Sequence, residues 1–583
     1  MATISVSLPA QVRVTTRRTL RARAHHLVAN LDWWLTITIT LAVSVSITAC
    51  TIAYINHDTL LYSDAYSHMI IARRVFDNTT PGLAQLGGVW LPLPHMIMLP
   101  FVWNITLWSS GIGGAIPSMI CYVVSGTYIF LAARRVTRRN TASLLGALVF
   151  LLNPNVLYVQ STPLTEPVMI ATMTMTSYYF LAWVQDNRQN YLIWAGLCTF
   201  FATLARYDGW SLYVAILVLI AIVGWHKRQQ VKEIAGNVLL YGILGGFGIA
   251  LWFLWNLIIF GNPLYFLNGP YSSQVMQMPL IKAGLVLTYH NIGQSIYYYS
   301  AISAETLGPV ILALAVIAVL VLVVRRVRSP DIWACLAFLV PFVFYIASLY
   351  SGQAVEYAPH AVPANVSTMF YNDRYGTQIV APAAFFIATL LSLFNRWGRT
   401  LLFGGIIAQT VLTATGGIIT LQDGLYGASC SPWRATTSFL AQHYDNTNIL
   451  EDTYFQNPQD FAFTVGIDLK NIVYQGSGAL WNQSLANPAT VHWIYAHPGD
   501  LVTRNIDVNS PAFLSQFVPV ANDSDGTVLY HLISAPLVQR TASPDMLTLH
   551  SACNKQTGDI HAAPNPLLAI RASAGQPIVK EEA

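Results

Sequence analysis

The sequence predicts a polytopic α-helical membrane protein that carries a small α/β domain at its C-terminal end. Hydrophobic residues make up 54% of the 583 residues and charged residues only 10%, compared with roughly 25% charged residues in soluble domains. Many apolar runs reach the roughly 20 residues that a helix needs to cross a hydrocarbon core. From about Gln422 the composition changes to that of a soluble domain. These observations together define the fold class.

The N-terminal segment, residues 1–32, is basic and precedes the first apolar run. That run, about 33–54, is too long for the apolar region of a signal peptide and lacks a small-residue cleavage site. We therefore expect a signal anchor with the N-terminus in the cytoplasm. The basic residues of this segment include Arg13, Arg17, Arg18, Arg21 and Arg23.

Apolar segments predict eleven membrane spans within a membrane domain of residues 33–421. They lie at about 33–55, 112–133, 141–159, 167–184, 190–205, 209–225, 235–259, 304–324, 331–350, 377–394 and 400–421. With eleven spans, every dense Arg/Lys cluster falls on the side of the N-terminus, as the positive-inside rule requires. We therefore expect a multi-pass protein of the plasma membrane whose C-terminal domain lies outside the cytoplasm.

The loop after the first span contains two predicted juxtamembrane helices. Residues 64–78 interleave apolar side chains with Arg73 and Arg74, a pattern typical of a helix that lies in the membrane interface. Residues 89–108 are apolar but contain Pro92, Pro94 and Pro100. The sequence leaves open whether this second segment lies along the membrane or dips into it.

The C-terminal region is predicted to form an extracytoplasmic α/β domain over residues 422–555, with a flexible tail over residues 556–583. Strand-like runs occur at 448–450, 472–474, 491–495, 517–520 and 527–530, and residues 433–444 have a helical pattern. Asp525-Gly526 indicates a hairpin turn before the last strand. The six cysteines show no spacing typical of a metal or redox site. Cys430 and Cys553 lie in this region, and the sequence leaves a disulfide between them open.

Ionisable residues are nearly absent from the centres of the predicted spans. Ion-coupled transporters need such residues at mid-depth to carry the coupling ion, so this pattern argues against a proton- or cation-driven transporter. The outer ends of the spans instead collect Asp58, Asp64, Glu166, Asp208, Glu305, Glu356, Asp373, His57, His68, His95, His290, His360, Arg73, Arg74, Arg206 and Arg374. We therefore expect the chemistry at the outer membrane–water boundary.

These residue types suit one reaction, the transfer of a sugar from a lipid phosphate. Deprotonation of an acceptor hydroxyl needs a general base, and Asp or Glu can act as one. The leaving lipid phosphate needs cations, and arginine binds phosphate through two parallel hydrogen bonds. Aromatic side chains provide flat surfaces for sugar rings. Tyrosines occur in the run 289–299 and at Tyr265 and Tyr271.

Structural explanations of the same residues stay open at the level of sequence. Asp64 suits the N-terminal cap of an interfacial helix, and Glu166 suits a helix N-terminus through the helix dipole. Arg206 and Asp208 are close enough in sequence to pair across a tight loop. His95 lies beside prolines and suits a packed position. The tyrosines also fit an aromatic belt at the membrane interface.

A set of short motifs gives the chain a resemblance to a known family. An acid, Asp64, follows the first span, and a proline-rich stretch with a histidine follows at residues 90–95. The other motifs are Pro163-Leu164-Thr165-Glu166-Pro167, Ala205-Arg206-Tyr207-Asp208-Gly209-Trp210 and Phe260-Gly261-Asn262-Pro263-Leu264-Tyr265-Phe266. Over roughly residues 30–430 the chain resembles the GT-C superfamily of membrane glycosyltransferases. The likeness is to dolichyl- or polyprenyl-phosphate-sugar enzymes related to protein O-mannosyltransferases and aminoarabinose transferases.

The resemblance implies roles for several outer-face residues. It implies that Asp64 is the catalytic base and that Glu166 is a second catalytic residue, which helps to hold the acceptor or the donor. It also makes Arg374 a candidate to bind the donor phosphate, and we expect Arg206 to share that task. The residues expected to bind substrate are His68, His95, Tyr265, Tyr298 and Tyr375.

Two departures from the family pattern bear on these expectations. The first loop of these enzymes often has two adjacent acids, whereas this chain has Ser63-Asp64-Ala65, which weakens the expectation of a metal site. The C-terminal domain has no Trp-Trp-Asp motif, which counts against an oligosaccharyltransferase. A divalent cation is the one cofactor considered, and the sequence leaves the requirement for it open.

The sequence therefore predicts an inverting glycosyltransferase that moves a sugar from a polyprenyl-phosphate donor to an acceptor hydroxyl at the outer face of the membrane. Its expected partners are that donor, membrane lipid and a protein, lipid or glycan acceptor, and no nucleic acid. Two alternatives stay open, a transporter or flippase of lipid-linked saccharide and a non-catalytic membrane scaffold. The deciding observation is whether one cavity of the folded protein holds Asp64, Glu166 and Arg374 together.

Overall fold

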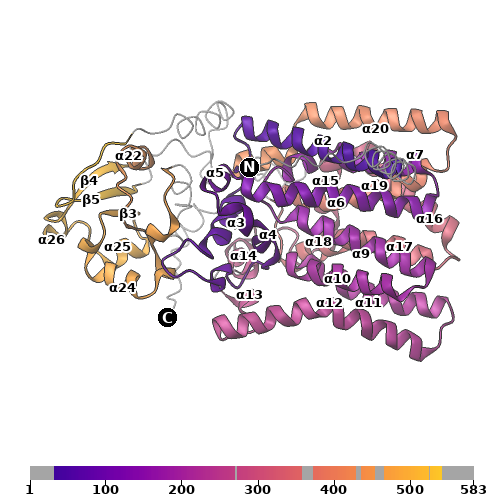
Figure 1. Ribbon diagram of the computed structural model, residues 1–583, viewed down its shortest axis with the longest axis horizontal. Coiled ribbons are helices and arrows are strands. Elements are labelled where there is room, and N and C mark those ends of the chain that lie inside the picture. The colour runs from indigo at the N-terminus through magenta and orange to yellow at the C-terminus, as the bar shows by residue number, and fades with distance from the viewer. Residues whose placement is uncertain are drawn as a thin grey trace, which may run out of the picture.

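The computed structural model describes residues 32–269, 272–356, 372–427, 435–452, 465–523 and 526–540. Most of the chain forms a bundle of helices that run side by side along the long axis, and a smaller domain with a β-sheet lies at one end of it (Figure 1). Cys430 and Cys553, between which the sequence leaves a disulfide open, and the predicted tail lie outside the described residues.

The bundle is built from helices that follow the predicted apolar segments. They are α2 (Trp33–Ile55), α6 (Ile112–Thr137), α7 (Asn140–Leu151), α8 (Pro154–Val159), α9 (Glu166–Asp186), α10 (Gln189–Ala205), α11 (Asp208–His226), α12 (Val231–Phe260), α16 (Pro309–Arg326), α17 (Asp331–Leu336), α18 (Val340–Ser351), α19 (Val380–Leu391) and α20 (Arg396–Gly416). Each of the eleven predicted segments coincides with one or two of these helices.

Within the described residues, seven helical segments are long and apolar enough to cross a membrane, so the multi-span helical fold is confirmed. They are α2, α6, α11, α12, α16, the α17–α18 unit and a segment that begins with α20. The other predicted spans coincide with α7–α8, α9, α10 and α19, which are shorter or less apolar. All twelve residues of α19 are buried, so this helix faces protein rather than lipid.

Small residues allow the helices of the bundle to approach closely, as is typical of membrane helices. Gly146 of α7 lies against α19, where an added Cβ would meet the Cβ of Ala388 at 2.3 Å. Gly126 of α6 lies in the same way against Leu151. The buried core of the bundle draws on α6, α7, α9, α16 and α19. The central helix α19 is therefore fixed by contacts on all its faces.

The loop after α2 contains the predicted juxtamembrane helices. The first is α3 (Ser63–Arg74), and the second is split into α4 (Leu93–Val102) and α5 (Ile105–Ser109). The split occurs because Asn104 adopts an extended conformation and caps α5, with its side chain accepting a hydrogen bond from the Leu107 amide. A short 3-10 helix, η1 (Leu83–Leu86), lies between α3 and α4.

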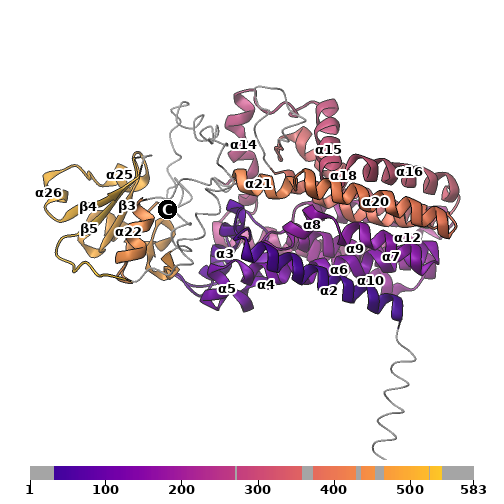
Figure 2. The same ribbon diagram turned by 90° about the horizontal axis from the view of Figure 1, so that it is seen from above.

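The long segment after α12 folds into α13 (Tyr265–Asn268), α14 (Ser273–Lys282) and α15 (Ile292–Leu307). The predicted span at about 304–324 begins later, at Pro309, because residues 304–307 still belong to α15. Gly308 separates the two helices with a φ of 85°, a conformation that glycine adopts without strain. Figure 2 shows α14 and α15 on the same side of the bundle as α16 and α18.

The C-terminal domain holds a five-stranded mixed sheet of order β2-β1-β3-β5-β4. The strands are β1 (Ile449–Leu450), β2 (Ile472–Val473), β3 (Trp493–Ala496), β4 (Phe517–Asn522) and β5 (Val528–Leu532), and the helices are α22 (Ala435–His443), α24 (Ala479–Ala486), α25 (Leu501–Asn505) and α26 (Pro511–Leu514). Strand β1 runs parallel to β2 and β3, whereas β5 is antiparallel to β3 and β4. All five predicted strands and the hairpin pairing are confirmed.

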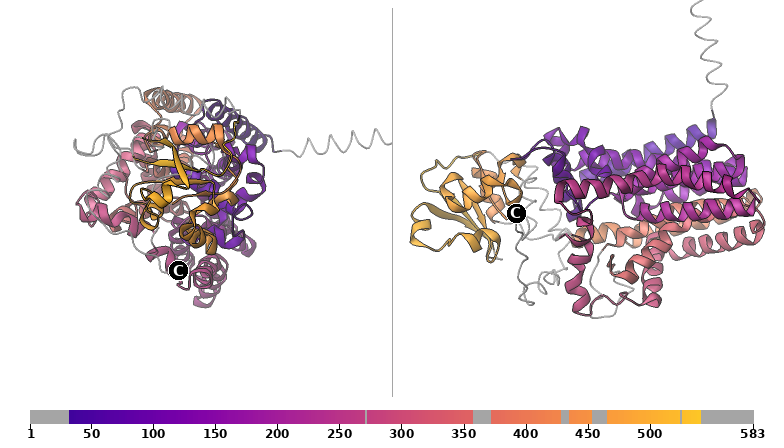
Figure 3. Two further views of the ribbon diagram at one scale, coloured as in Figure 1. Left: turned by 90° about the vertical axis from the view of Figure 1, so that its left-hand side faces the viewer. Right: turned by 90° about the horizontal axis from the view of Figure 1, so that it is seen from below.

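The C-terminal domain contacts the bundle through the loop that carries α3. The Lys470 amide donates to Asp77 Oδ1 at 3.0 Å, and Asn78 Nδ2 donates to the Tyr474 hydroxyl at 3.3 Å. One hydrophobic core cluster contains Met69 of α3 together with Trp493 of the sheet. The domain therefore lies beyond α3, at the end of the bundle seen on the left in Figure 2 and on the left of the right-hand view in Figure 3.

Candidate active site

Asp64 lies in the first turn of α3, at the end of the bundle that meets the C-terminal domain. Tyr62 occupies the N-cap position of this helix, and no side chain caps it, so Asp64 does not act as the cap. The Asp64 side chain is 31% exposed, and its Oδ2 accepts a hydrogen bond from Arg374 Nη2. Asp64 is therefore a carboxylate that is partly open to solvent and held by one arginine.

Glu166 is the first residue of α9, and its side chain is only 1% exposed. Its Oε1 accepts hydrogen bonds from Arg206 Nη1 at 2.9 Å and from Arg374 Nε at 3.1 Å. The preceding Thr165 hydroxyl also accepts from Arg206 Nη1, at 2.6 Å. Burying a carboxylate is costly unless it is paired, and here two guanidinium groups compensate one carboxylate. Glu166 therefore joins the two arginines.

Arg206 lies in an extended conformation between α10 and α11. Its Nε lies 3.4 Å from Asp208 Oδ1, which agrees with the local pair that the sequence left open. Its Nη2 donates to the Tyr345 hydroxyl at 3.2 Å, and that hydroxyl donates to Asp208 Oδ2 at 3.3 Å. Because Arg206 also pairs with Glu166, the local pair is only one part of its environment.

Arg374 is the second residue of the short helix η3 (Asp373–Ile379), which leads into α19. Its guanidinium group forms ion pairs with both predicted acids, Asp64 and Glu166. The Tyr62 ring lies 4.9 Å from its Cζ, and the Tyr375 ring lies 5.4 Å from it. The Tyr375 ring is also 5.2 Å from Arg206 Cζ, so one aromatic ring lies between two cations.

His68 and His95 form a buried pair beside this cluster. The distance between His68 Nδ1 and His95 Nε2 is 2.9 Å, so one ring donates to the other. His68 lies one helical turn after Asp64 and therefore on the same face of α3. Burial lowers the pKa of His68 to about 3. The imidazole is thus neutral at physiological pH and is suited to neutral hydrogen bonding rather than to pairing with a phosphate.

Tyr265 and Tyr298 occupy different surroundings from the ion-paired cluster. The Tyr265 ring stacks on Phe260 with centroids 4.2 Å apart. Tyr298 is 2% exposed and packs in a core cluster with Tyr299 and Tyr345. Substrate binding by these two tyrosines stays a prediction, whereas Tyr375 lies directly between the two arginines.

Reasoning from sequence missed Tyr345, whose hydroxyl connects Arg206 to Asp208. Tyr345 lies in the apolar segment of α18, and nothing in its local sequence distinguishes it from neighbouring aromatic residues. It also missed Thr165 as a partner of Arg206, although Thr165 is part of the quoted motif around Glu166. These roles depend on contacts between elements that are distant in sequence, which local patterns do not report.

The site can therefore combine three chemical properties at one place. Asp64 supplies a partly exposed carboxylate, the two arginines supply cations, and Tyr375 supplies an aromatic face. Among the residues that the structure describes, no group of three or more His, Cys, Asp or Glu side chains is arranged to hold a metal ion. The requirement for a divalent cation stays open.

The similarity of this chain to known proteins indicates its class. Residues 92–259 match the family of dolichyl-phosphate-mannose-protein mannosyltransferases. This range includes Glu166 and Arg206 but neither Asp64 nor Arg374. A comparison with curated protein sequences finds no match.

Solved structures with a similar fold include ArnT from Cupriavidus metallidurans. The structure bound to undecaprenyl phosphate has a TM-score of 0.51 and 12% sequence identity, and the match covers 86% of this chain and 99% of that chain. The apo structure has a TM-score of 0.51 and 13% identity, with 85% and 98% covered. An oligosaccharyltransferase from Archaeoglobus fulgidus has a TM-score of 0.44 and 11% identity, with 90% and 77% covered, which is too low to define a shared fold.

The family match over residues 92–259 and the fold shared with ArnT agree with the predicted membrane glycosyltransferase of the GT-C type. Through residues 92–259 the chain is related to the dolichyl-phosphate-mannose-protein mannosyltransferase family, so the predicted resemblance and the prediction of an enzyme are confirmed.

Proposed function

We propose that this glycosyltransferase transfers a sugar from a polyprenyl-phosphate donor to the hydroxyl group of an acceptor, with inversion at the anomeric carbon. The main support for this proposal is that Arg374 forms ion pairs with both Asp64 and Glu166. It places a candidate base and a candidate phosphate ligand beside each other. The undecaprenyl phosphate bound to ArnT, which shares the fold, supports a lipid phosphate as the carrier.

The proposed step is a single displacement. Asp64 accepts the proton of the acceptor hydroxyl, and the acceptor oxygen forms a bond to the anomeric carbon of the sugar. The bond between that carbon and the phosphate oxygen breaks, and its electron pair leaves with the polyprenyl phosphate. Arg374 and Arg206 stabilise the negative charge of the leaving phosphate.

Arg374 has a second proposed task, because it holds Asp64 before the donor binds. The Asp64 side chain is 31% exposed and that of Glu166 only 1%, so the contact with Asp64 is the one that can open. A donor phosphate competes for the same guanidinium and releases the Asp64 carboxylate to act as the base. Glu166 keeps both arginines in place and is therefore a positioning residue.

We also propose the predicted topology for the whole chain, with eleven spans, a cytoplasmic N-terminus and the site on the outer face of the plasma membrane. The domain limits stay at residues 1–32, 33–421, 422–555 and 556–583, although α21 (Ile419–Gly427) runs across the boundary between residues 421 and 422. Support comes from the surplus of arginines at the ends of α6 and α16, opposite to Asp64.

The test is a transfer assay with the purified full-length enzyme. Labelled polyprenyl-phosphate sugars are offered with protein, lipid and glycan acceptors, and the labelled product identifies the sugar and the acceptor. The Asp64→Asn variant should lose about 10²–10⁴-fold in rate. It should still bind polyprenyl phosphate at least as tightly as the wild type, because Arg374 loses its competing carboxylate.

Asp186→Asn is the matched control, since Asp186 forms an ion pair with Arg135 at the opposite end of the bundle. It should retain full transfer activity. Full activity of Asp64→Asn would remove Asp64 as the base. Equal loss of transfer and of lipid binding in that variant would show a structural role instead.

A further inference from the structure

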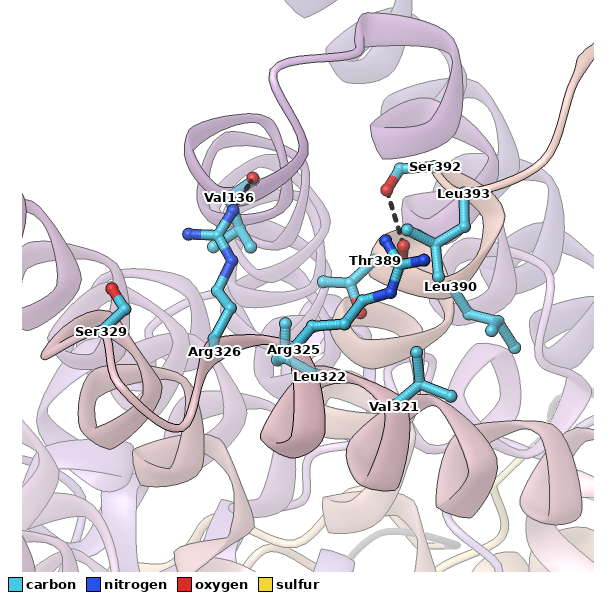
Figure 4. A pocket seen from close by; sticks show the side chains of 10 residues that line it. All are labelled: Val136, Val321, Leu322, Arg325, Arg326, Ser329, Thr389, Leu390, Ser392 and Leu393. Carbon is cyan, nitrogen blue, oxygen red and sulfur yellow. Dashed lines mark hydrogen bonds between the residues drawn. The ribbon is translucent and has the colours of Figure 1, made fainter.

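A cavity of about 510 Å³ lies at the end of the bundle opposite to Asp64. Its walls come from the last turns of α6, α16 and α19 and from the segments that follow α16 and α19 (Figure 4). Helix α19 begins directly after η3, which holds Arg374, and its twelve residues span about 18 Å. The cavity is therefore separate from the candidate active site. Its size falls within the range of small-molecule sites.

The two arginines of this cavity have different surroundings. The Arg326 guanidinium group is bound within the protein. Its Nη1 donates to Asp331 Oδ2 at 3.2 Å, and its Nη2 donates to the Val136 carbonyl at 3.0 Å. Arg325 extends from α16 toward Thr389 of α19 (Figure 4). Within the described parts of the chain, Arg325 forms no ion pair. The cavity therefore contains a cation that is available to an anion.

The surrounding charges favour an anion as well. Three of the acids at this end form ion pairs, Asp32–Arg134, Asp186–Arg135 and Asp331–Arg326, and Glu233, in the exposed first turn of α12, does not line the cavity. The other polar side chains that line the cavity, Thr389 and Ser392, are neutral hydroxyls that donate to carbonyl groups of their own segment. The local potential at the cavity is therefore positive.

The remaining walls are apolar and continue onto the lipid-facing surface. Leu322 and Leu390 line the cavity together with Leu393, which is 41% exposed. Val324, next to Arg325, is 77% exposed. A ligand that fits has a negatively charged head and a hydrocarbon chain, because a free anion leaves these apolar walls in contact with water.

We propose that this cavity binds the headgroup of an anionic phospholipid, with Arg325 as the ligand of the phosphate group. The acyl chains would then lie along the exposed face of α16 at Val324 and against Leu393, which follows the end of α19. Basic pockets between membrane helices bind anionic headgroups in this way. The site would lie in the leaflet opposite to the one that holds the candidate active site.

The full-length chain in nanodiscs provides the test. The discs contain phosphatidylcholine with increasing fractions of phosphatidylglycerol, and native mass spectrometry counts the bound lipids. The wild type should retain phosphatidylglycerol in preference to phosphatidylcholine. Arg325→Ala should lower the affinity for phosphatidylglycerol about fivefold, and Arg325→Lys should lower it less.

Arg328→Ala is the matched control, because Arg328 is exposed, lies three residues away and does not line the cavity. Equal effects of Arg325→Ala and Arg328→Ala would overturn the proposal in favour of general surface attraction. Displacement of the lipid by millimolar inorganic phosphate would show a site for a free anion. Stronger binding of polyprenyl phosphate than of phosphatidylglycerol would assign the cavity to the carrier lipid instead.

Discussion

The two ends of the helix bundle hold their charges in different ways. Near the C-terminal domain, Asp64, Glu166, Arg206 and Arg374 come from four separate elements and are joined in one network. At the opposite end the ion pairs are separate, as between Arg135 and Asp186, and they lie closer to solvent. Burial of a charged network is costly, so its presence at one end indicates a function, whereas the separate pairs are explained by topology.

Glu166→Gln should show the largest difference between the two ends, as a loss of stability. It leaves two guanidinium groups without their shared carboxylate, and breaking a buried ion pair costs about 3–5 kcal/mol. The corresponding change at the opposite end, Asp186→Asn, should cost less than about 1 kcal/mol. Thermal unfolding of both variants in detergent measures the difference. Similar shifts in Tm would mean that the charged groups at the two ends contribute equally to stability.

Arg374→Lys tests the network through activity. Lysine keeps the charge but cannot contact Asp64 and the donor phosphate with a planar fork. We expect kcat/KM to fall about 100-fold, mainly through weaker stabilisation of the leaving phosphate. Arg135→Lys, at the opposite end, should leave the kinetics unchanged. If Arg374→Lys keeps wild-type kinetics, Arg374 is not the phosphate ligand.

His68 predicts a dependence of stability on pH. Its pKa is about 3 in the folded protein because the ring is buried, against about 6.5 in the unfolded chain. The unfolded state therefore binds more protons below pH 6.5, and stability falls as the pH decreases toward 3. Between pH 7 and pH 5 the loss should be about 2 kcal/mol.

His68→Gln should remove most of this pH dependence, as measured by the Tm at several pH values. His226→Gln is the control, since His226 lies exposed at the opposite end. An unchanged pH profile in His68→Gln would show that another group is responsible.

Tyr345→Phe should have the smallest effect. It removes only the hydroxyl that links Arg206 to Asp208, and a hydrogen bond to a charged group is worth about 1.5–3 kcal/mol. Transfer should fall about tenfold, and the Tm should fall less than in Glu166→Gln. Tyr350→Phe, on the exposed side of the same helix, should have no effect. A loss of stability without a loss of activity would place Tyr345 in the structural part of the bundle.

Much of the fold could be predicted because it depends on local patterns. Apolar length located the helices, and short β-branched runs located even the two-residue strands β1 and β2. The order of the strands could not be predicted, because β1 pairs in parallel with β2 and β3, which come much later in the sequence. The end of α15 at Gly308 was also missed, because an apolar pattern continues through that glycine.

The residues of the candidate site could be predicted in part, because some of them stand out in the local sequence. Asp64, Glu166, Arg206 and Arg374 were expected on one face, because a charge beside a membrane span is unusual enough to be noticed. Which arginine contacts which acid could not be predicted, since each contact joins elements separated by tens or hundreds of residues. Tyr345 could not be identified from the sequence, because aromatic residues are common in apolar spans.

Helix α3 acts as a spacer of fixed length between the candidate base and the C-terminal domain. Asp64 lies in its first turn, and Asp77, which holds the domain through the Lys470 amide, follows just after its last residue. The twelve residues of α3 measure about 18 Å. An acceptor held at the contact of Asp77 with Lys470 would therefore span about that length, or about five or six residues of extended peptide, to present its hydroxyl to Asp64.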